Sequence, residues 1–472
     1  MTPFRYILRS LLHYRFAHAG VLAGTILGAT VLLGALFAGD SVKASLRRIG
    51  EKRIGHTTHV LSAGDRFFRQ ALADEFAAAA NVRTAPVLYA RGTAVSPSNR
   101  ATANQVQLIG VTEAFWKFAP TPTTIALNAA RSTIAVNDTL ARRLQIKSGD
   151  TLIVRLQKPG ILVGNAPVAG AETTLQTLRC TVASIVNDES FGRFTLESTQ
   201  VPPPSVFLPL ELLQEIVERP NKANLLLIDA APATAQPGGE PPAHDRAPDT
   251  STAGINLQSA LVKTVKLGDY GLSLKWLEQA GMFEVASDRV FIDPELANAV
   301  PGAVPGTQPV VSYLVNEFRV RDRSTPYSIV TGTNHLAAPF LPSDLGAEEI
   351  VLNDWLADDL QASVGDDVRL TFFQAGTGDS LIEKSATFRV RSIVPLQGLA
   401  ADKSWMPEFP GMSDAARPDD WDPGLPLDLD RIRPKDETYW DNHRGAPKAF
   451  IPLAAGRANW STRWGSYTAI RI

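Results

Sequence analysis

An apolar run near the N-terminus is the first pattern along the chain. Residues 19–39 read AGVLAGTILGATVLLGALFAG, 21 residues without a charge. As a helix rising 1.5 Å per residue, this run spans roughly the 30 Å hydrocarbon core of a bilayer. A buried core helix seldom runs so long without a polar face. A cleaved signal peptide needs a small residue three positions before the cleavage site, and this chain has the bulky Leu36 there. The pattern predicts an uncleaved transmembrane helix over 19–39, preceded by the short segment 1–18.

A helical stalk is predicted directly after this span. Val42, Leu46 and Ile49 recur at helical spacing, with basic residues on the other faces. We expect the membrane helix to continue over 40–55, with its basic residues either solvated or in contact with lipid head groups.

The basic residues around the span leave its orientation open. Arg5, Arg9 and Arg15 precede the span, whereas five basic residues follow it between Lys43 and Arg53. This count favours a cytoplasmic location for the large domain. Long domains, however, are translocated largely regardless of charge.

An internal repeat is the most informative feature of the remaining chain. Residues 134–150 (IAVNDTLARRLQIKSGD) and 350–366 (IVLNDWLADDLQASVGD) match without a gap. Nine pairs are identical: Ile134/Ile350, Asn137/Asn353, Asp138/Asp354, Leu140/Leu356, Ala141/Ala357, Leu144/Leu360, Gln145/Gln361, Gly149/Gly365 and Asp150/Asp366. The pattern predicts a strand, a helix capped by Asn-Asp, a Gly-Asp turn and a returning strand in each copy.

The flanking segments extend the repeat into two whole units. The parallels are Asp65-Arg66 with Asp288-Arg289, Pro86 to Leu88 with Pro309 to Val311, Cys180 to Val186 with Val390 to Val394, Phe207 to Leu210 with Phe450 to Leu453, and Asn224 to Ile228 with Thr468 to Ile472. We therefore predict an α+β fold with duplicated mixed α/β units at 56–229 and 255–472.

Two segments fall outside this pattern. Residues 230–254 hold five prolines and no large apolar side chain, which predicts a disordered, flexible linker. Residues 398–445 mix Trp405, Trp421, Tyr439 and Trp440 with many Asp and Pro residues and show no clear period. This insertion is interpreted as a long loop packed on the surface of its unit, the alternative being a flap that faces a partner or substrate.

Composition and motifs exclude several kinds of chemistry. The net charge of −2 gives no basis for binding nucleic acid, and the single cysteine, Cys180, excludes an internal disulfide. No phosphate-binding loop, H-E-x-x-H motif or nucleophile elbow is present. His56 and His59 lack the glutamate and third ligand of a zinc site, so we interpret them as ordinary polar residues.

An acidic run in the insertion has no calcium-loop spacing, and we interpret it as a solvated loop. Its members are Asp419, Asp420, Asp422, Asp428 and Asp430. We predict no catalytic, cofactor-binding or metal-binding residues, and no enzymatic activity.

The anchor, stalk and repeat together resemble a known family. The residues that carry the likeness are the span 19–39, GDSVKASLRRI (39–49), VQLIGV (106–111), IAVNDTLARRLQIKSGDTLIV (134–154) and SVFLPL (205–210). They resemble FtsX/MacB/LolC-type ABC transporter permeases, specifically their MacB-like periplasmic core domain. WMPEFPG (405–411), PLDLDRIRPKDETYW (426–440) and PKAFIPL (447–453) resemble a large-ectodomain branch of FtsX-like permeases.

The resemblance implies mechanical work without local chemistry. A separate cytoplasmic ABC ATPase would hydrolyse ATP, and a homodimer or heterodimer of permeases would relay the motion to an extracytoplasmic substrate or partner. It also implies a cell (inner) membrane location, with 1–18 cytoplasmic and the large domain periplasmic. Such permeases carry three further membrane helices, so we expect this chain to be a fragment. A single-pass interaction or receptor protein and a membrane-anchored hydrolase remain as alternatives.

Overall fold

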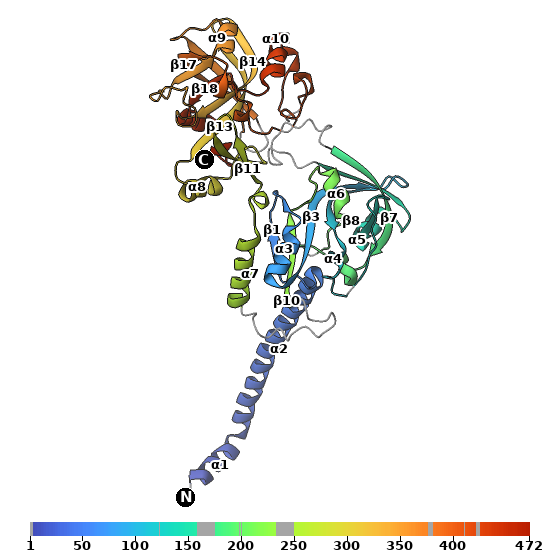
Figure 1. Ribbon diagram of the computed structural model, residues 1–472. Helices are drawn as coiled ribbons and strands as arrows, with labels where there is room; N and C mark the ends of the chain where they lie inside the picture. Colours follow the sequence, from blue (N-terminus) through green and yellow to red (C-terminus); the bar gives the residue numbers. More distant parts are fainter. Residues whose placement is uncertain are drawn as a thin grey trace.

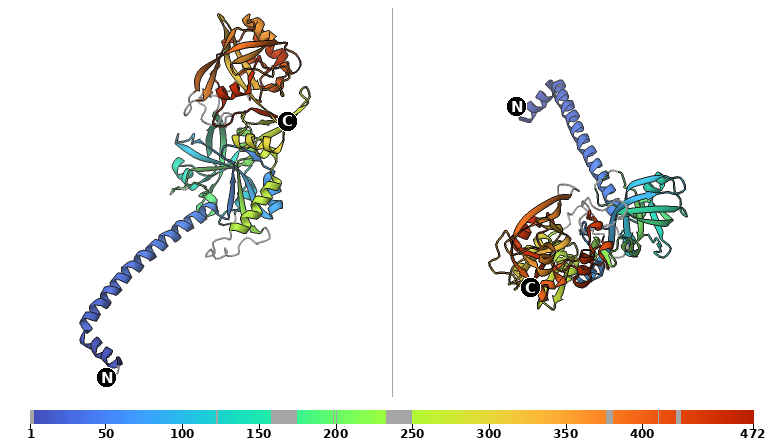
Figure 2. Two further views of the ribbon diagram at one scale, coloured as in Figure 1. Left: turned by 90° about the vertical axis from the view of Figure 1, so that its left-hand side faces the viewer. Right: turned by 90° about the horizontal axis from the view of Figure 1, so that it is seen from above.

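A long helix and two stacked units make up the protein. The computed structural model describes residues 3–121, 123–157, 175–197, 199, 201–232, 250–375, 381–409, 411–421 and 425–472. Figure 1 shows the N-terminal helix leading into the first unit, with the second unit on its far side. Figure 2 shows the same succession after a quarter turn. The fold is mixed α/β, with one apolar N-terminal helix and two similar barrel-like sheets.

Two consecutive helices form the N-terminal part of the chain. A short helix α1 (Pro3–His13) leads into α2 (Arg15–Ile54), which has 40 residues and contains both the apolar run and the stalk. At 1.5 Å per residue α2 is about 60 Å long. None of its residues is classed as buried, and by length and composition it could cross a membrane.

The first unit is built on an eight-stranded sheet of order β1-β10-β3-β4-β8-β5-β7-β6, closed by pairing of β3 with β6. Its strands are β1 (His59–Ser62), β3 (Val82–Val95), β4 (Thr102–Val111), β5 (Thr133–Asn137), β6 (Thr151–Gln157), β7 (Leu175–Val186), β8 (Ser205–Pro209) and β10 (Leu225–Pro232). The other elements are the pair β2 (Phe68–Arg69) and β9 (Lys222–Ala223), the π-helix η1 (Asp188–Gly192), and helices α3 (Leu72–Ala80), α4 (Glu113–Trp116), α5 (Asp138–Leu144) and α6 (Leu210–Ile216).

The second unit is built on a nine-stranded sheet of order β11-β12-β19-β13-β14-β18-β15-β17-β16, closed by pairing of β13 with β16. Its strands are β11 (Leu272–Leu277), β12 (Met282–Ser287), β13 (Gln308–Val320), β14 (Arg323–Thr333), β15 (Glu349–Asn353), β16 (Asp367–Ala375), β17 (Leu381–Val394), β18 (Ala449–Pro452) and β19 (Ala469–Arg471). The helices after the first unit are α7 (Thr250–Thr264), α8 (Pro294–Ala303), α9 (Asp354–Leu360), α10 (Pro434–His443) and α11 (Leu453–Trp460).

The two sheets share one topology. The run β10-β3-β4-β8-β5-β7-β6 has the same order as β19-β13-β14-β18-β15-β17-β16. The pairs β4–β8 and β14–β18 are both parallel, as are β5–β7 and β15–β17. Even the register irregularity recurs, after Ile134 in β5 and after Ile350 in β15. The predicted duplication is confirmed.

The repeated motif folds identically in its two copies. Asn137 caps α5 by accepting a hydrogen bond from the Leu140 amide (2.9 Å), and Asn353 caps α9 through the Leu356 amide (2.8 Å). Gly149 and Gly365 then turn the chain at φ of 94° and 95°, a region that favours glycine. The identities Asn137/Asn353 and Gly149/Gly365 therefore mark positions where the backbone needs a side-chain cap or a left-handed residue.

Helix α7 packs on the first unit. It begins at Thr250, inside the predicted linker, and Ala260 is buried in the same cluster as Leu72 and Phe76. Figure 1 shows α7 beside α3. By packing, α7 belongs with the first unit, whereas the sequence suggested that the second unit starts at 255. The rest of the predicted linker, from 233 to 249, lies outside the described residues.

The insertion 398–445 packs against the second unit. It contains α10 and the 3₁₀ turns η3 (Gly398–Ala401), η4 (Lys403–Trp405), η5 (Pro418–Asp420) and η6 (Leu429–Arg431). Trp405, Trp421, Tyr439 and Trp440 are all buried. The sequence analysis did not predict α10, because the buried face of this helix consists of Asp436, Tyr439 and Trp440 and so lacks a stripe of apolar residues.

Candidate functional site

The junction between α2 and the first unit is the first candidate site. The helix ends at Gly55, whose φ of +55° favours glycine. A Cβ atom at this position would lie 2.0 Å from the carbonyl oxygen of Phe118. The His56 amide donates a hydrogen bond to the same oxygen (2.9 Å), and the Thr58 amide donates to Ile228 of β10 (2.9 Å). The chain therefore leaves the helix through a tightly fixed turn.

An aromatic cluster lies under this turn. Phe115 packs on Phe191, Phe194 and Phe207 with ring centroids 4.9 to 5.9 Å apart, and Trp116 packs on Phe207 at 5.3 Å. All five side chains are buried. A Cβ atom on Gly55 would lie 3.1 Å from the ring of Phe191, so the cluster joins the end of α2 to β8, which carries Phe207.

One polar contact secures the helix beside the cluster. The guanidinium of Arg53, in the last turn of α2, donates to the backbone carbonyl of Thr199. Arg53 belongs to the basic stalk, to which the sequence assigned solvation or lipid contact. At this position the structure instead shows a protein contact.

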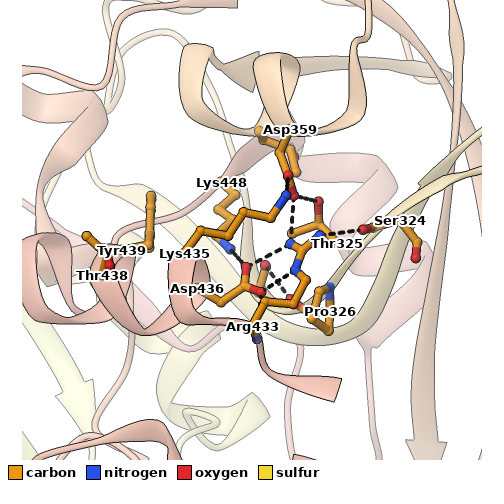
Figure 3. Close-up of polar contacts among 12 residues, drawn as sticks. Ser324, Thr325, Pro326, Asp359, Arg433, Lys435, Asp436, Thr438, Tyr439 and Lys448 are labelled. Atoms are coloured by element: carbon orange, nitrogen blue, oxygen red, sulfur yellow. Dashed lines mark hydrogen bonds and ion pairs between the residues drawn. The ribbon is translucent and has the colours of Figure 1, made fainter. Parts of the chain in front are cut away.

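The buried ionic cluster of the second unit is the second candidate site, shown in Figure 3. Asp359 of α9 accepts hydrogen bonds from Thr325 (2.6 Å), from Arg433 (2.7 Å) and from Lys435. Burial by itself would raise the pKa of Asp359, but these three donors outweigh it and hold that pKa below the ordinary value. The insertion is thus tied to α9 by a carboxylate that stays ionised.

Asp436 of α10 forms the other half of the cluster. Its carboxylate accepts two hydrogen bonds from Arg433 (2.6 and 2.9 Å) and one from Lys448 (3.4 Å). The ammonium of Lys448 also lies over the rings of Trp355 (4.0 Å) and Tyr439 (4.7 Å). Burial lowers the pKa of Lys448 to about 8. No sequence signal identified this cluster, because its members come from four distant segments.

The residues that the sequence singled out for possible metal binding do not converge. His56 and His59 are both exposed, and the ring of His59 contacts Thr58 (3.1 Å). Within the described residues, no group of three or more His, Cys, Asp or Glu side chains could hold a metal ion.

The acidic run is spread along the insertion. Asp419 lies 3.7 Å from Arg417, and the backbone amide of Asp428 donates to the hydroxyl of Tyr327 (2.7 Å). Asp420 and Asp430 fall in the separate turns η5 and η6, and Asp422 lies outside the described residues.

Cys180 is a buried free cysteine in β7. Burial raises the pKa of its thiol to about 12, so the reactive thiolate is scarce at neutral pH.

A family comparison assigns the first unit. Residues 19–237 match the sequence model described as the MacB-like periplasmic core domain. This part of the chain is a MacB-like periplasmic core domain. The match covers α2 from residue 19 onward and the whole sheet of the first unit. MacB-like domains of this kind belong to ABC transporter permeases, in agreement with the resemblance noted in the sequence.

Several solved structures are similar to the chain. The periplasmic region of MacB from Actinobacillus actinomycetemcomitans aligns at 8% identity over 51% of this chain and 85% of its own, with a TM-score of 0.26. The extracellular domain of the noncanonic ABC-type transporter YknZ from Gram-positive bacteria aligns at 9% identity over 42% of this chain and 83% of its own, with a TM-score of 0.26.

A domain of a putative permease protein from Porphyromonas gingivalis aligns at 13% identity over 39% of this chain and 73% of its own, with a TM-score of 0.22. These scores are low, and the family assignment rests on the matched residues 19–237. A search of curated proteins found no match.

The second unit lies outside the residues matched to the MacB-like domain. Its sheet nevertheless repeats the strand order of that domain. The segment after β7 differs most between the two copies. In the MacB-like domain it is short and carries Phe191 to the end of α2, whereas in the second unit it is the insertion with the ionic cluster.

Proposed function

We propose that this chain is a permease subunit of an ABC-type transporter, and that its ectodomain carries ATP-driven motion to an extracytoplasmic substrate or partner. The unbroken helix α2 is the observation that carries this proposal. It leads from the apolar run at 19–39 to the buried aromatic cluster of the MacB-like domain without an intervening hinge. A movement of the membrane segment would therefore displace the sheet as one body.

The proposal assigns no chemical step to this chain. A separate cytoplasmic ABC ATPase would supply the energy, with residues 1–18 on the same side of the cell membrane and both units on the other. Two permease subunits, identical or related, would work together. The chain itself is expected neither to bind nor to hydrolyse ATP, since its sequence has no phosphate-binding loop.

A flexible insertion that interrupts helix α2 tests the proposal. The tagged full-length chain is isolated from its native membranes with its bound subunits, and hydrogen exchange of both units is measured with and without ATP. We expect ATP to change exchange in the ectodomain. Four flexible Gly-Ser residues inserted after Gly50 should abolish this change, because a helix transmits force only while it is continuous.

A seven-residue helical insertion at the same place serves as the matched control. It adds about two turns and keeps the helix rigid, so the response to ATP should persist. An ATP response that survives the flexible insertion would contradict mechanical coupling through α2. A chain that carries no ATPase with it, and whose ectodomain ignores ATP, would favour a single-pass interaction protein.

A further inference from the structure

A cavity of about 220 Å³ lies between the two units. Asp65 and Arg66 line it from the first unit. The second unit contributes the rest of the lining: Tyr270, Leu272, Ser287, Arg289, Phe291, Asp293, Leu296, Arg463 and Trp464. Pockets for drug-sized ligands measure about 300–1,000 Å³, so any ligand of this cavity is small.

Reciprocal ion pairs hold the walls of the cavity together. Arg66 of the first unit pairs with Asp293 of the second. Arg289 of the second unit pairs with Asp65 of the first at 2.9 Å. Asp65 and Arg289 belong to the duplicated Asp-Arg motif, so the repeat itself supplies both sides of this interface. Each of these two carboxylates in the lining is matched by an arginine.

Arg463 carries a positive charge that no carboxylate of the lining balances. Three arginines and two aspartates face the cavity, and no carboxylate partner of Arg463 occurs within the described residues. Its guanidinium lies 4.4 Å from the ring centroid of Trp464. A guanidinium presents paired N–H donors that match the two oxygens of a carboxylate.

A tight turn holds Arg463 and Trp464 in place. The amide of Thr462 donates to the carbonyl of Gly465 (2.9 Å), and the amide of Gly465 donates back to Thr462 (3.2 Å). A Cβ atom on Gly465 would lie 2.3 Å from the backbone oxygen of Ile292, so the turn is seated against the second unit. The backbone that carries Arg463 and Trp464 is therefore fixed before any ligand arrives.

Much of the remaining lining is apolar and aromatic. Tyr270, Leu272, Phe291 and Leu296 lie there together with Trp464. Phe291 and Leu272 are buried, while Tyr270 is about half exposed. Aromatic side chains pack favourably on the rings of a ligand.

We propose that the cavity between the units is a binding site for a small aromatic carboxylate. The carboxylate lies against Arg463, and the ring lies among Trp464, Phe291 and Tyr270. This site is independent of the proposed transport function.

Calorimetry on the full-length chain in zwitterionic lipid nanodiscs tests the proposal with 2-naphthoate as the probe. We expect saturable binding of one probe per chain after subtraction of empty nanodiscs. Arg463→Gln should weaken binding about tenfold or more, because it removes a charge-assisted hydrogen bond. Arg457→Gln is the matched control, since Arg457 is exposed, lies over Tyr467 and does not line the cavity.

Two further probes separate charge from shape. The neutral 2-naphthamide should bind much more weakly than 2-naphthoate, and octanoate should bind more weakly because it has no ring to stack. Equal binding of the amide would overturn the assignment to an anion, and equal binding of octanoate would overturn the aromatic part. Absence of saturable binding up to the solubility limit, or equal losses in the two arginine variants, would remove the site altogether.

Discussion

The buried Lys448 should make the second unit more stable as the pH rises above neutrality. Burial lowers its pKa from an ordinary 10.5 to about 8, and the nearby Asp436 only partly opposes this shift. Between these two values the unfolded chain binds more protons than the folded one. The free energy of unfolding therefore increases with pH in this window.

The expected gain is about 2.5 kcal/mol between about pH 7 and about pH 10. It follows from the two pKa values by integrating the difference in bound protons, and the full shift would correspond to about 3.4 kcal/mol. The window closes near pH 10 because burial raises the pKa of Tyr439 above its ordinary 10.0. Above that pH the unfolded hydroxyl loses its proton first, which destabilises the folded state.

Urea unfolding of the full-length chain in detergent, followed by tryptophan fluorescence, measures this effect. All the tryptophans except Trp116 lie in the second unit, so the signal reports on the unit that contains Lys448. Lys448→Met should remove the rise with pH. Lys403→Met, at an exposed lysine of the same insertion, is the matched control and should keep it.

The difference between the two variants decides whether Lys448 causes the rise in stability with pH. If Lys448→Met and Lys403→Met show the same dependence of unfolding free energy on pH, the surroundings of Lys448 do not lower its pKa toward neutrality. A native protein that loses stability from pH 7 to 10 relative to Lys448→Met would reverse the predicted sign.

Three further predictions concern the junctions and the topology. Gly55→Ala should destabilise the first unit by about 2–4 kcal/mol in urea unfolding, because it adds a left-handed φ penalty to a backbone clash; Gly64→Ala, with a similar φ and open space around it, should cost only about 1 kcal/mol, and equal losses would refute the clash. Arg289→Asp should loosen the contact between the units, which would be measured as faster hydrogen exchange at their interface. Adding Asp65→Arg should restore the contact at low salt but not at high salt, because salt screens the exchanged ion pair. If the double variant does not recover at low salt, the pair does not hold the units together. In a Cys180→Ser background, Asp414→Cys should react with a membrane-impermeant maleimide without rupture of the cytoplasmic membrane, once the reagent passes any outer membrane; labelling only after rupture would place the domain in the cytoplasm.

Local physical signals in the sequence were enough to predict the N-terminal helix and the duplication of the ectodomain unit. A run of 21 uncharged residues can be read as a membrane helix because length and apolarity alone meet the requirement. Asn137 and Asn353 were readable as helix caps, and Gly149 and Gly365 as turns, because each position satisfies its own neighbouring backbone. The same strand order in the two sheets follows from these repeated local choices.

The candidate sites depended on contacts that no local pattern contains. Lys448 is an unremarkable lysine in the sequence, and it becomes a buried cation only when β18 is covered by α10 of the insertion. Helix α7 begins inside the predicted linker, yet its apolar face is covered by α3 of the first unit. Arg463 meets Asp65 and Arg66 across one cavity although about 400 residues separate them in the chain. Burial, pairing and the closing of a cavity are properties of segments brought together in space, so only the tertiary structure decided them.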